Sequence, residues 1–359
     1  MNDFEEYIKQ GEPDKREKAI IWQTAIGLQQ VDGLTPSAYL IETARQHIEG
    51  DITIDEVQSR IAAYYETAAS RQAGEDDRTK EADTVSSRIT KILSEKTFSF
   101  SPTEYLNIHK RLFSGIYEFA GKMREHNITK AEWALDGDTV LYSGADNLGA
   151  TLEYDFEKEK KFNYRGLTPQ QIVEHIARFT SDLWQIHVFG EGNTRTTAVF
   201  LIKYLRKLGF KRVNNDLFKR HSWYFRNALV RANYKNLDAG VYSTDVYLVR
   251  FLRNLLLGEK NALKNRELHI RHVATADAAA KGGRKKVVRQ GGQTRWSDNL
   301  IKVFDLIRNN PRITRKELSK TLQINPSAVQ KHLEKLKNER RIVRVGSDNA
   351  GSWKILIRS

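Results

Sequence analysis

A glycine-rich turn at residues 189–193 interrupts the longest helical stretch of this sequence, and it constrains the fold more than any other feature. Across residues 84–257 apolar side chains recur mostly at helical spacing, which predicts a largely helical domain over that range. The turn contains Gly190 and Gly192 and is followed by an apolar-periodic helix at residues 194–208. Because the first turn of a helix has free backbone N–H groups, the side chains beside this turn lie next to a ready-made anion site.

The residues around this turn are those that phosphate chemistry requires. Gly190 and Gly192 let the backbone approach a ligand closely. Arg195, in the first helical turn, can bind phosphate oxygens with its forked guanidinium, and Glu191 is a hard oxygen ligand suited to Mg²⁺. His187 titrates near neutrality and can take a proton from an attacking hydroxyl. A histidine alone would more often be a buried, hydrogen-bonded core residue, but the complete set favours a nucleotide site.

Residues 187–195, HVFGEGNTR, resemble the Fic family motif H-x-F-x-[D/E]-G-N-[G/K]-R-x-x-R, and the resemblance extends over most of residues 97–257. Residues 112–124 are similar to the family's LF…WAGKYR segment. The resemblance implies a mainly α fold, an all-helical Fic core with a short β-hairpin flap. It also implies a protein adenylyltransferase that moves AMP from ATP to a Ser, Thr or Tyr hydroxyl of a target protein, with Mg²⁺ as cofactor.

The same resemblance assigns roles by position. His187 would be the catalytic base that deprotonates the target hydroxyl, and Glu191 would hold the metal. The nucleotide-binding residues would be Gly190, Gly192, Asn193, Thr194 and Arg195.

Residues 128–144 interrupt the helical pattern, because Asp136-Gly137 lies there between short alternating runs. Asp-Gly between such runs is a hairpin signal. In the resemblance this hairpin is the family's flap, at about residues 129–142, which would pair with the backbone of the target protein as an added strand.

Two positions depart from the family pattern. Thr194 replaces the usual Gly or Lys, and Ala198 stands where the family has its second arginine. In the family that arginine orients the γ-phosphate and pairs with an inhibitory glutamate. Its absence leaves three alternatives open: another nucleotide donor such as UTP, phosphodiester hydrolysis, and a nucleotide-sensing transcription regulator with a weak or inactive Fic core.

Residues 1–70 resemble the antitoxin-like helices that precede some Fic domains. Asp32-Gly33 occupies the place of the Glu-Gly of the family's inhibitory motif, although Leu28 replaces the Ser or Thr. Since Asp is shorter than Glu and its expected partner is Ala198, we expect these helices to pack on the Fic core and inhibit weakly, or by another contact. The alternative is that Gly33 only ends a helix.

After a basic, glycine-rich stretch at residues 258–294, which predicts a flexible linker, order resumes in residues 295–359. Residues 299–309 suit a first helix, and Thr314 with Glu317 forms a capping box that opens a second. A third helix begins near residue 326, and strands are expected at 342–345 and 353–357. The segment resembles bacterial winged helix-turn-helix domains.

Charge indicates what this C-terminal segment binds. Residues 296–359 contain 14 Lys and Arg against 6 Asp and Glu, a net of +8 out of +14 for the whole chain. A basic helix-turn-helix favours DNA over the alternative of protein contacts. The residues expected at the DNA are Ser327, Gln330, Lys331 and Lys335.

The remaining composition narrows the class of protein. The chain has no cysteine, so thiolate metal sites and cysteine nucleophiles are excluded. No apolar run approaches the roughly 20 residues that span a bilayer, and the acidic N-terminus lacks a signal pattern. We therefore expect a cytoplasmic protein without a membrane partner, and a homodimer is compatible with the sequence.

Overall fold

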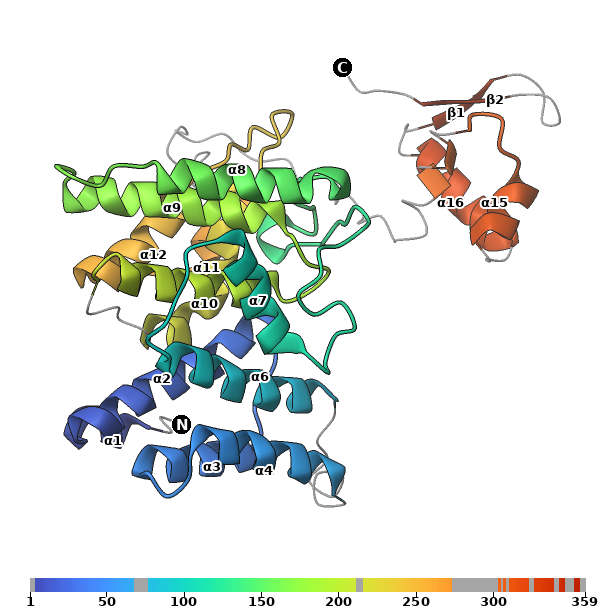
Figure 1. The fold of residues 1–359 in the computed structure, drawn as a ribbon. Helices are drawn as coiled ribbons and strands as arrows, with labels where there is room; N and C mark the ends of the chain where they lie inside the picture. Colours follow the sequence, from blue (N-terminus) through green and yellow to red (C-terminus); the bar gives the residue numbers. More distant parts are fainter. Residues whose placement is uncertain are drawn as a thin grey trace, which may run out of the picture. The chain divides into compact units, whose positions relative to one another are not determined.

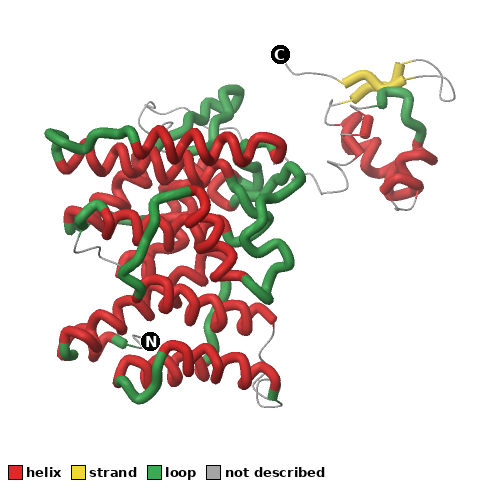
Figure 2. The backbone as a smooth tube through the Cα atoms, viewed as in Figure 1, coloured by secondary structure: helices red, strands yellow, loops and turns green. Residues whose placement is uncertain are grey.

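The computed structural model describes residues 4–67, 77–210, 216–272, 303–304, 306–307, 310–322, 326–338, 342–345 and 352–355. The chain divides into two compact units, Met1–Gly282 and Gly283–Ser359. Over these described residues the secondary structure is helical except for one two-stranded sheet in the second unit (Figure 2) and an isolated β-bridge between Asn236 and Val241. The predicted mainly α fold class is therefore confirmed. No helix within these ranges is long and apolar enough to cross a membrane.

The first unit is built from helices joined by loops and short 3₁₀ turns (Figure 1). Its α-helices are α1 (Glu5–Gln10), α2 (Pro13–Gln29), α3 (Ala38–Glu49), α4 (Ile54–Glu66), α6 (Asp77–Ser94), α7 (Pro102–Phe113), α8 (Leu148–Lys160), α9 (Pro169–Ile186), α10 (Asn193–Lys207), α11 (Asp216–Ala232) and α12 (Val246–Leu257). Its 3₁₀ turns are η1 (Gln30–Asp32), η2 (Trp133–Leu135), η3 (Ala145–Asn147) and η4 (Asn265–Leu268).

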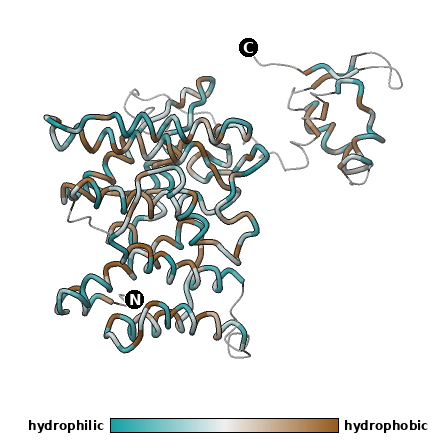
Figure 3. The backbone as a smooth tube through the Cα atoms, viewed as in Figure 1, coloured by the Kyte–Doolittle hydropathy of each residue, from teal (hydrophilic) through white to brown (hydrophobic). Residues whose placement is uncertain are grey.

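Helix α10 is the centre of this unit. Every residue from Asn193 to Leu205 is buried, so the helix has no solvent face over that length. It packs against α2, α6, α7 and α9. Apolar and polar residues are interspersed along the surrounding helices, as expected for helices that bury one side (Figure 3). The turn that starts α10 is consequently fixed to the most buried element of the fold.

Helix α2 attaches the N-terminal helices to this core through two buried faces. Ile21, Ala25 and Leu28 belong to the main core cluster. Ala19 and Trp22, on another face of α2, pack in a separate cluster with residues of α3 and α4. The N-terminal helices are therefore packed on the helical core through an element shared by both clusters.

A buried histidine in this N-terminal cluster gives stability a pH dependence. Trp22 Nε1 donates a hydrogen bond to His47 Nδ1 at 3.0 Å, and burial, with Lys18 nearby, lowers the His47 pKa to about 4. The folded state therefore keeps His47 neutral, whereas the unfolded chain takes up a proton below about pH 6.5. Stability present above pH 6.5 is lost as the pH falls toward 4, by about 3 kcal/mol from this residue.

Urea unfolding followed by tryptophan fluorescence between pH 7 and 4 measures this loss. His47→Asn keeps an acceptor for Trp22 without a titrating ring, so its unfolding free energy should fall less steeply with acid. A slope remains, because burial also lowers the pKa of His109 to about 4. Equal slopes for the variant and the unaltered protein would contradict the assignment to His47.

The flap differs in form from its prediction. Asp136 and Gly137 both have positive φ, 57° and 88°, as a tight Asp-Gly turn requires. Glu132 N donates to the carbonyl of Asp138 at 2.9 Å, but no strands flank the turn. Instead η2 curls inward, and Ala134 and Leu135 are buried in the core. Burial of consecutive residues prevents the alternation of a strand, so the predicted β-hairpin is a turn without strands.

The predicted linker begins later than residue 258. Tyr247 Oη donates to the carbonyl of Glu267 at 2.8 Å, and Leu268 is completely buried in the main core. Residues 258–272 therefore pack on α11 and α12 rather than leaving the domain. Residues 273–294 lie outside the described residues.

The second unit contains α15 (Arg315–Leu322), α16 (Pro326–Asn338), β1 (Ile342–Val345) and β2 (Ser352–Ile355). The strands pair antiparallel with Ile342 opposite Ile355. Thr314 and Glu317 form the predicted capping box, in which Glu317 N donates to Thr314 Oγ1 at 3.2 Å and Thr314 N donates to Glu317 Oε2 at 2.7 Å. The small core of this unit is formed by Val303, Ile307, Ile313, Leu318, Val329, Leu333, Leu336, Ile342 and Trp353.

Candidate active site

His187 occupies the end of α9 and faces the flap. It is the C-cap residue of that helix, with the left-handed conformation φ 52°, ψ 58°. Its ring centroid lies 4.0 Å from that of Tyr142 and 5.2 Å from that of Trp184. Only 3% of the residue is exposed, and neither ring nitrogen has a hydrogen-bond partner among the described residues. Buried polar atoms are rarely left unpaired without a functional reason, so this imidazole is a candidate for proton transfer.

The surroundings of His187 keep it neutral. Burial lowers its pKa well below the ordinary value, and the positive charges of Lys130 and Arg226 lower it further. A neutral imidazole at pH 7 has a free lone pair and can accept a proton. The ring is therefore in the protonation state that a general base needs.

The loop after His187 is locked by its own side chains. The Asn193 amide donates to the carbonyl of Phe189 at 2.7 Å, and its oxygen accepts from Phe189 N at 3.0 Å. Gly192 has φ 79°, and a Cβ there would lie 2.5 Å from Cε2 of Phe113. Any larger residue would have to displace that ring, so Gly192 is required by space as well as by conformation. The Asn193 side chain shapes the loop rather than facing a ligand.

His109 of α7 packs against the same loop and hydrogen-bonds to it. Gly121 N donates to its Nδ1 at 2.8 Å, so the ring proton is on Nε2, which donates to the carbonyl of Glu191 at 3.0 Å. The ring also stacks on Phe189 with a centroid distance of 3.6 Å. His109 is a positioning residue that was not identified from the sequence, since no local pattern links it to a loop residue 82 positions away.

Glu191 and Thr194 have different environments. The Glu191 carboxylate is half exposed and pairs with Lys130 of the flap. Thr194 is buried, and its hydroxyl accepts a hydrogen bond from Trp184 Nε1 at 3.0 Å. Gly190 packs against the ring of Phe119. The Thr194 side chain therefore anchors the start of α10, whereas the Glu191 carboxylate is accessible to a cation.

Arg195 is buried between a carboxylate of η1 and one of α6. It is 1% exposed, and its Nε lies 2.8 Å from Asp32 Oδ2 and its Nη2 lies 2.6 Å from Glu81 Oε1. Gln29 accepts from its Nη1 at 3.1 Å. Asp32 does not pair with residue 198, as Ala198 led us to expect, and it pairs with Arg195, the first motif arginine, instead. Gly33, with φ 68°, ends η1 directly after it.

Arg226 of α11 extends this network. Its Nη1 lies 3.1 Å from Asp32 Oδ1, and its Nη2 lies 3.0 Å from Glu132 Oε1. Asp32 therefore bridges two arginines. Neither Arg226 nor Glu81 was identified from the sequence, because Arg226 has no motif around it and Glu81 lies in a polar helix. Asp32, Glu81 and Arg226 line one cavity of about 460 Å³. Its lining includes Asp32, Gly33, Glu81, Tyr117, Glu191, Arg195, Trp223 and Arg226.

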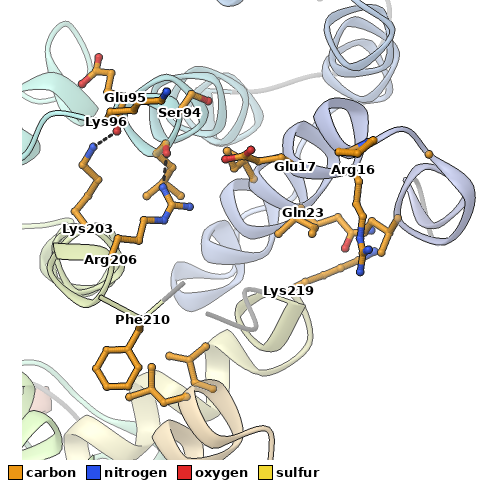
Figure 4. A pocket seen from close by; sticks show the side chains of 18 of the residues that line it. Arg16, Glu17, Gln23, Ser94, Glu95, Lys96, Lys203, Arg206, Phe210 and Lys219 are labelled. Carbon is orange, nitrogen blue, oxygen red and sulfur yellow. Dashed lines mark hydrogen bonds between the residues drawn. The ribbon is translucent and has the colours of Figure 1, made fainter. Parts of the chain in front are cut away.

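A larger cavity of about 1660 Å³ lies away from His187, along α2, α10 and the end of α6. Figure 4 shows Lys203 and Arg206 pointing from α10 toward residues 94–96. Lys203 donates to the carbonyls of Ile92 and Glu95, and Arg206 donates to that of Leu93. These cations satisfy carbonyls at the C-terminus of α6, which is a structural role.

The candidate DNA-contacting residues all lie in α16. The Gln330 side chain is half-buried, accepts from Arg315 Nη1 at 3.0 Å and donates to Glu334 Oε1 at 2.9 Å. The side chains of Ser327, Lys331 and Lys335 lie outside the described residues.

Comparison with known proteins finds a family model that matches part of each unit. Residues 99–205 match the model of the Fic/DOC family, and residues 297–343 match that of the winged helix-turn-helix DNA-binding domain. Protein adenylyltransferase VbhT of Bartonella schoenbuchensis is 28% identical over 131 residues, which cover 36% of this chain and 26% of that protein. The match thus spans about a quarter of that relative's length. A Fic family protein from Desulfovibrio desulfuricans G20 aligns with a TM-score of 0.45 and 12% identity, over 99% of this chain and 91% of that one.

Proposed function

We propose that this chain, which carries a Fic domain at residues 99–205 and a winged helix-turn-helix domain at residues 297–343, is a protein adenylyltransferase. The observation that carries the proposal is the buried, neutral His187, whose unpaired nitrogens lie at the turn that opens α10. The match of residues 99–205 to the Fic/DOC family model and a 28% identical relative named a protein adenylyltransferase support the choice of reaction.

In the proposed reaction the chain supplies position and charge. The hydroxyl oxygen of a Ser, Thr or Tyr attacks the α-phosphorus of ATP, the new O–P bond forms, and the bond to the leaving pyrophosphate breaks. An imidazole nitrogen of His187 accepts the hydroxyl proton. Free backbone N–H groups at the start of α10 and the Arg195 guanidinium neutralise phosphate charge. Tyr142 covers His187, so the target segment has to displace it to reach the base.

Glu191 fits the role of a magnesium ligand. Its carboxylate is half exposed and is paired with a lysine rather than hydrogen-bonded into the core. No cluster of three or more metal-ligating side chains occurs in the described part of the chain, which suits an ion held by one carboxylate together with nucleotide phosphates and water. When bound, Mg²⁺ would supply charge neutralisation on the phosphates, and Lys130 would have to release Glu191.

Mass spectrometry of the full chain tests the proposed activity. The purified protein is incubated with Mg²⁺ and a mixture of nucleoside triphosphates, alone and with cell extract. A mass gain of one adenylyl group on this chain or on another protein supports the proposal. A uridylyl group would correct the donor, and hydrolysis without any modified protein would reject protein transfer.

The paired state of the site favours one alternative, a regulator that senses nucleotide. Arg195 pairs with Asp32 and Glu191 pairs with Lys130, so neither side chain is free to bind nucleotide or metal until its ion pair breaks. This arrangement is what a catalytically weak or inactive core would show. Under this alternative the second unit binds DNA and responds to ATP, while no protein is modified.

We also propose that the second unit binds duplex DNA. The net charge of +8 over residues 296–359 predicts affinity that falls steeply with salt. Replacing Lys331 or Lys335 with alanine should each lower the salt slope, plotted as log affinity against log salt, by about 1, if both contact phosphates. Fluorescence anisotropy of a labelled duplex measures the slope, with Lys320→Ala on α15 as the control. Affinity that does not depend on salt would exclude the phosphate contacts.

A further inference from the structure

Arg195 and Arg226, which lie near the motif, each have a buried Nε atom that makes no hydrogen bond to the described residues. Asp32 Oδ2 is 2.8 Å from Arg195 Nε, but it too lacks a hydrogen bond, so this contact is an ion pair of poor geometry. Buried donors without acceptors cost free energy. The short Asp32 side chain therefore fills the space between the two arginines incompletely.

The other partners of the two arginines lie on different nitrogens. Glu81 binds Nη2 of Arg195, and Glu132 binds Nη2 of Arg226 through both carboxylate oxygens, at 3.0 and 3.2 Å. Among the described residues only Asp32 bridges the pair, through one oxygen to each. The space that its carboxylate occupies is therefore an anion site with two cationic walls, open to the 460 Å³ cavity.

Helix α10 contributes one cation, Arg195, to the lining of this cavity. The motif provides Arg195, but position 198 is an alanine that is completely buried in the main core. The Ala198 side chain packs against apolar neighbours and is not among the residues that line the cavity. Arg226 lines that cavity from α11.

We propose that Arg226 is a second phosphate-binding residue, and that the distal phosphates of a nucleoside triphosphate bind between Arg195 and Arg226 in place of the Asp32 carboxylate. This inference rests on the proposed function, because it assigns a residue to the nucleotide. A phosphate offers three oxygens, enough to accept from both forked guanidinium groups. Arg226 then favours triphosphates over monophosphates, which lack the distal groups.

The test uses the full chain with Asp32→Ala, which empties the site while Arg195 keeps Glu81 and Arg226 keeps Glu132. Calorimetry with Mg²⁺ gives dissociation constants for ATP and for AMP. Adding Arg226→Ala should raise the ATP value about 10- to 100-fold and change the AMP value less than twofold. Arg250→Ala is the matched control, because Arg250 pairs with Glu267 at 3.0 Å and does not line the cavity.

Removing Arg226 leaves the buried Glu132 unpaired and can unfold the protein. Arg226→Ala combined with Glu132→Gln is therefore compared with Glu132→Gln alone, again with Asp32→Ala. The same ATP affinity with and without Arg226, equal weakening for ATP and AMP, or no ATP binding once Asp32 is removed overturns the inference. Protein modification, measured separately, tests the proposed function. If the preference for triphosphates depends on Arg226 but no AMP is transferred to protein, the proposed transferase activity is rejected and the phosphate-binding role of Arg226 stands.

Discussion

Replacing His187 with alanine should lower the rate of AMP transfer by about 10²- to 10⁴-fold, the usual contribution of a general base. The reason is that the described structure offers the incoming hydroxyl no other neutral, unpaired imidazole at the start of α10. Binding of ATP should change little, since the phosphates are proposed to contact the backbone of α10 and Arg195. Autoradiography with labelled ATP measures transfer, and calorimetry measures binding.

His126→Ala is the matched control, because His126 is exposed and only its backbone carbonyl is used, as an acceptor for Arg124. His187→Gln retains much of the ring's volume without its basicity, so it separates proton transfer from packing against Tyr142. If both substitutions at position 187 transfer AMP at the unaltered rate, the base lies elsewhere and the proposed mechanism is wrong.

Local features of this chain could be predicted from the sequence. Asp136-Gly137 forms the expected tight turn because only two residues decide its dihedral angles. Thr314 and Glu317 form the expected capping box for the same reason. The turn at residues 189–193 precedes a buried helix as its spacing indicated. In each case the interacting residues lie within a few positions of one another, so residue types and their spacing are enough to predict the local structure.

The connections made across the fold could not be predicted in the same way. Asp32, Arg195 and Arg226 come from η1, α10 and α11, and their contact depends on how those elements pack. Reasoning from the motif alone paired the inhibitory position with residue 198 and therefore expected a missing salt bridge. In the fold Asp32 pairs with Arg195 of the motif and also with Arg226 of α11, and spacing in the sequence cannot indicate the second of these contacts.

The second large effect is expected at Asp32. Asp32→Ala should raise the affinity for ATP, and the rate of AMP transfer at low ATP, by about 10- to 100-fold, because ATP no longer competes with a carboxylate that two arginines bind. A point substitution is preferable to deleting residues 1–70, since Ile21, Ala25 and Leu28 of α2 are part of the main core and their loss would unfold it. Calorimetry and the transfer assay with labelled ATP measure the two effects.

Asp14→Ala is the control for loss of a negative charge from the N-terminal helices, because Asp14 is exposed on α2 and pairs only at the surface with Lys18. Asp32→Asn keeps the size of the side chain but removes its charge, so it should behave like Asp32→Ala if charge is what blocks the site. A rise with alanine but not with asparagine would instead mean that the side chain blocks by its volume. No rise with either would make Asp32 a structural bridge between α10 and α11, and the N-terminal helices would then stabilise the Fic domain without inhibiting it.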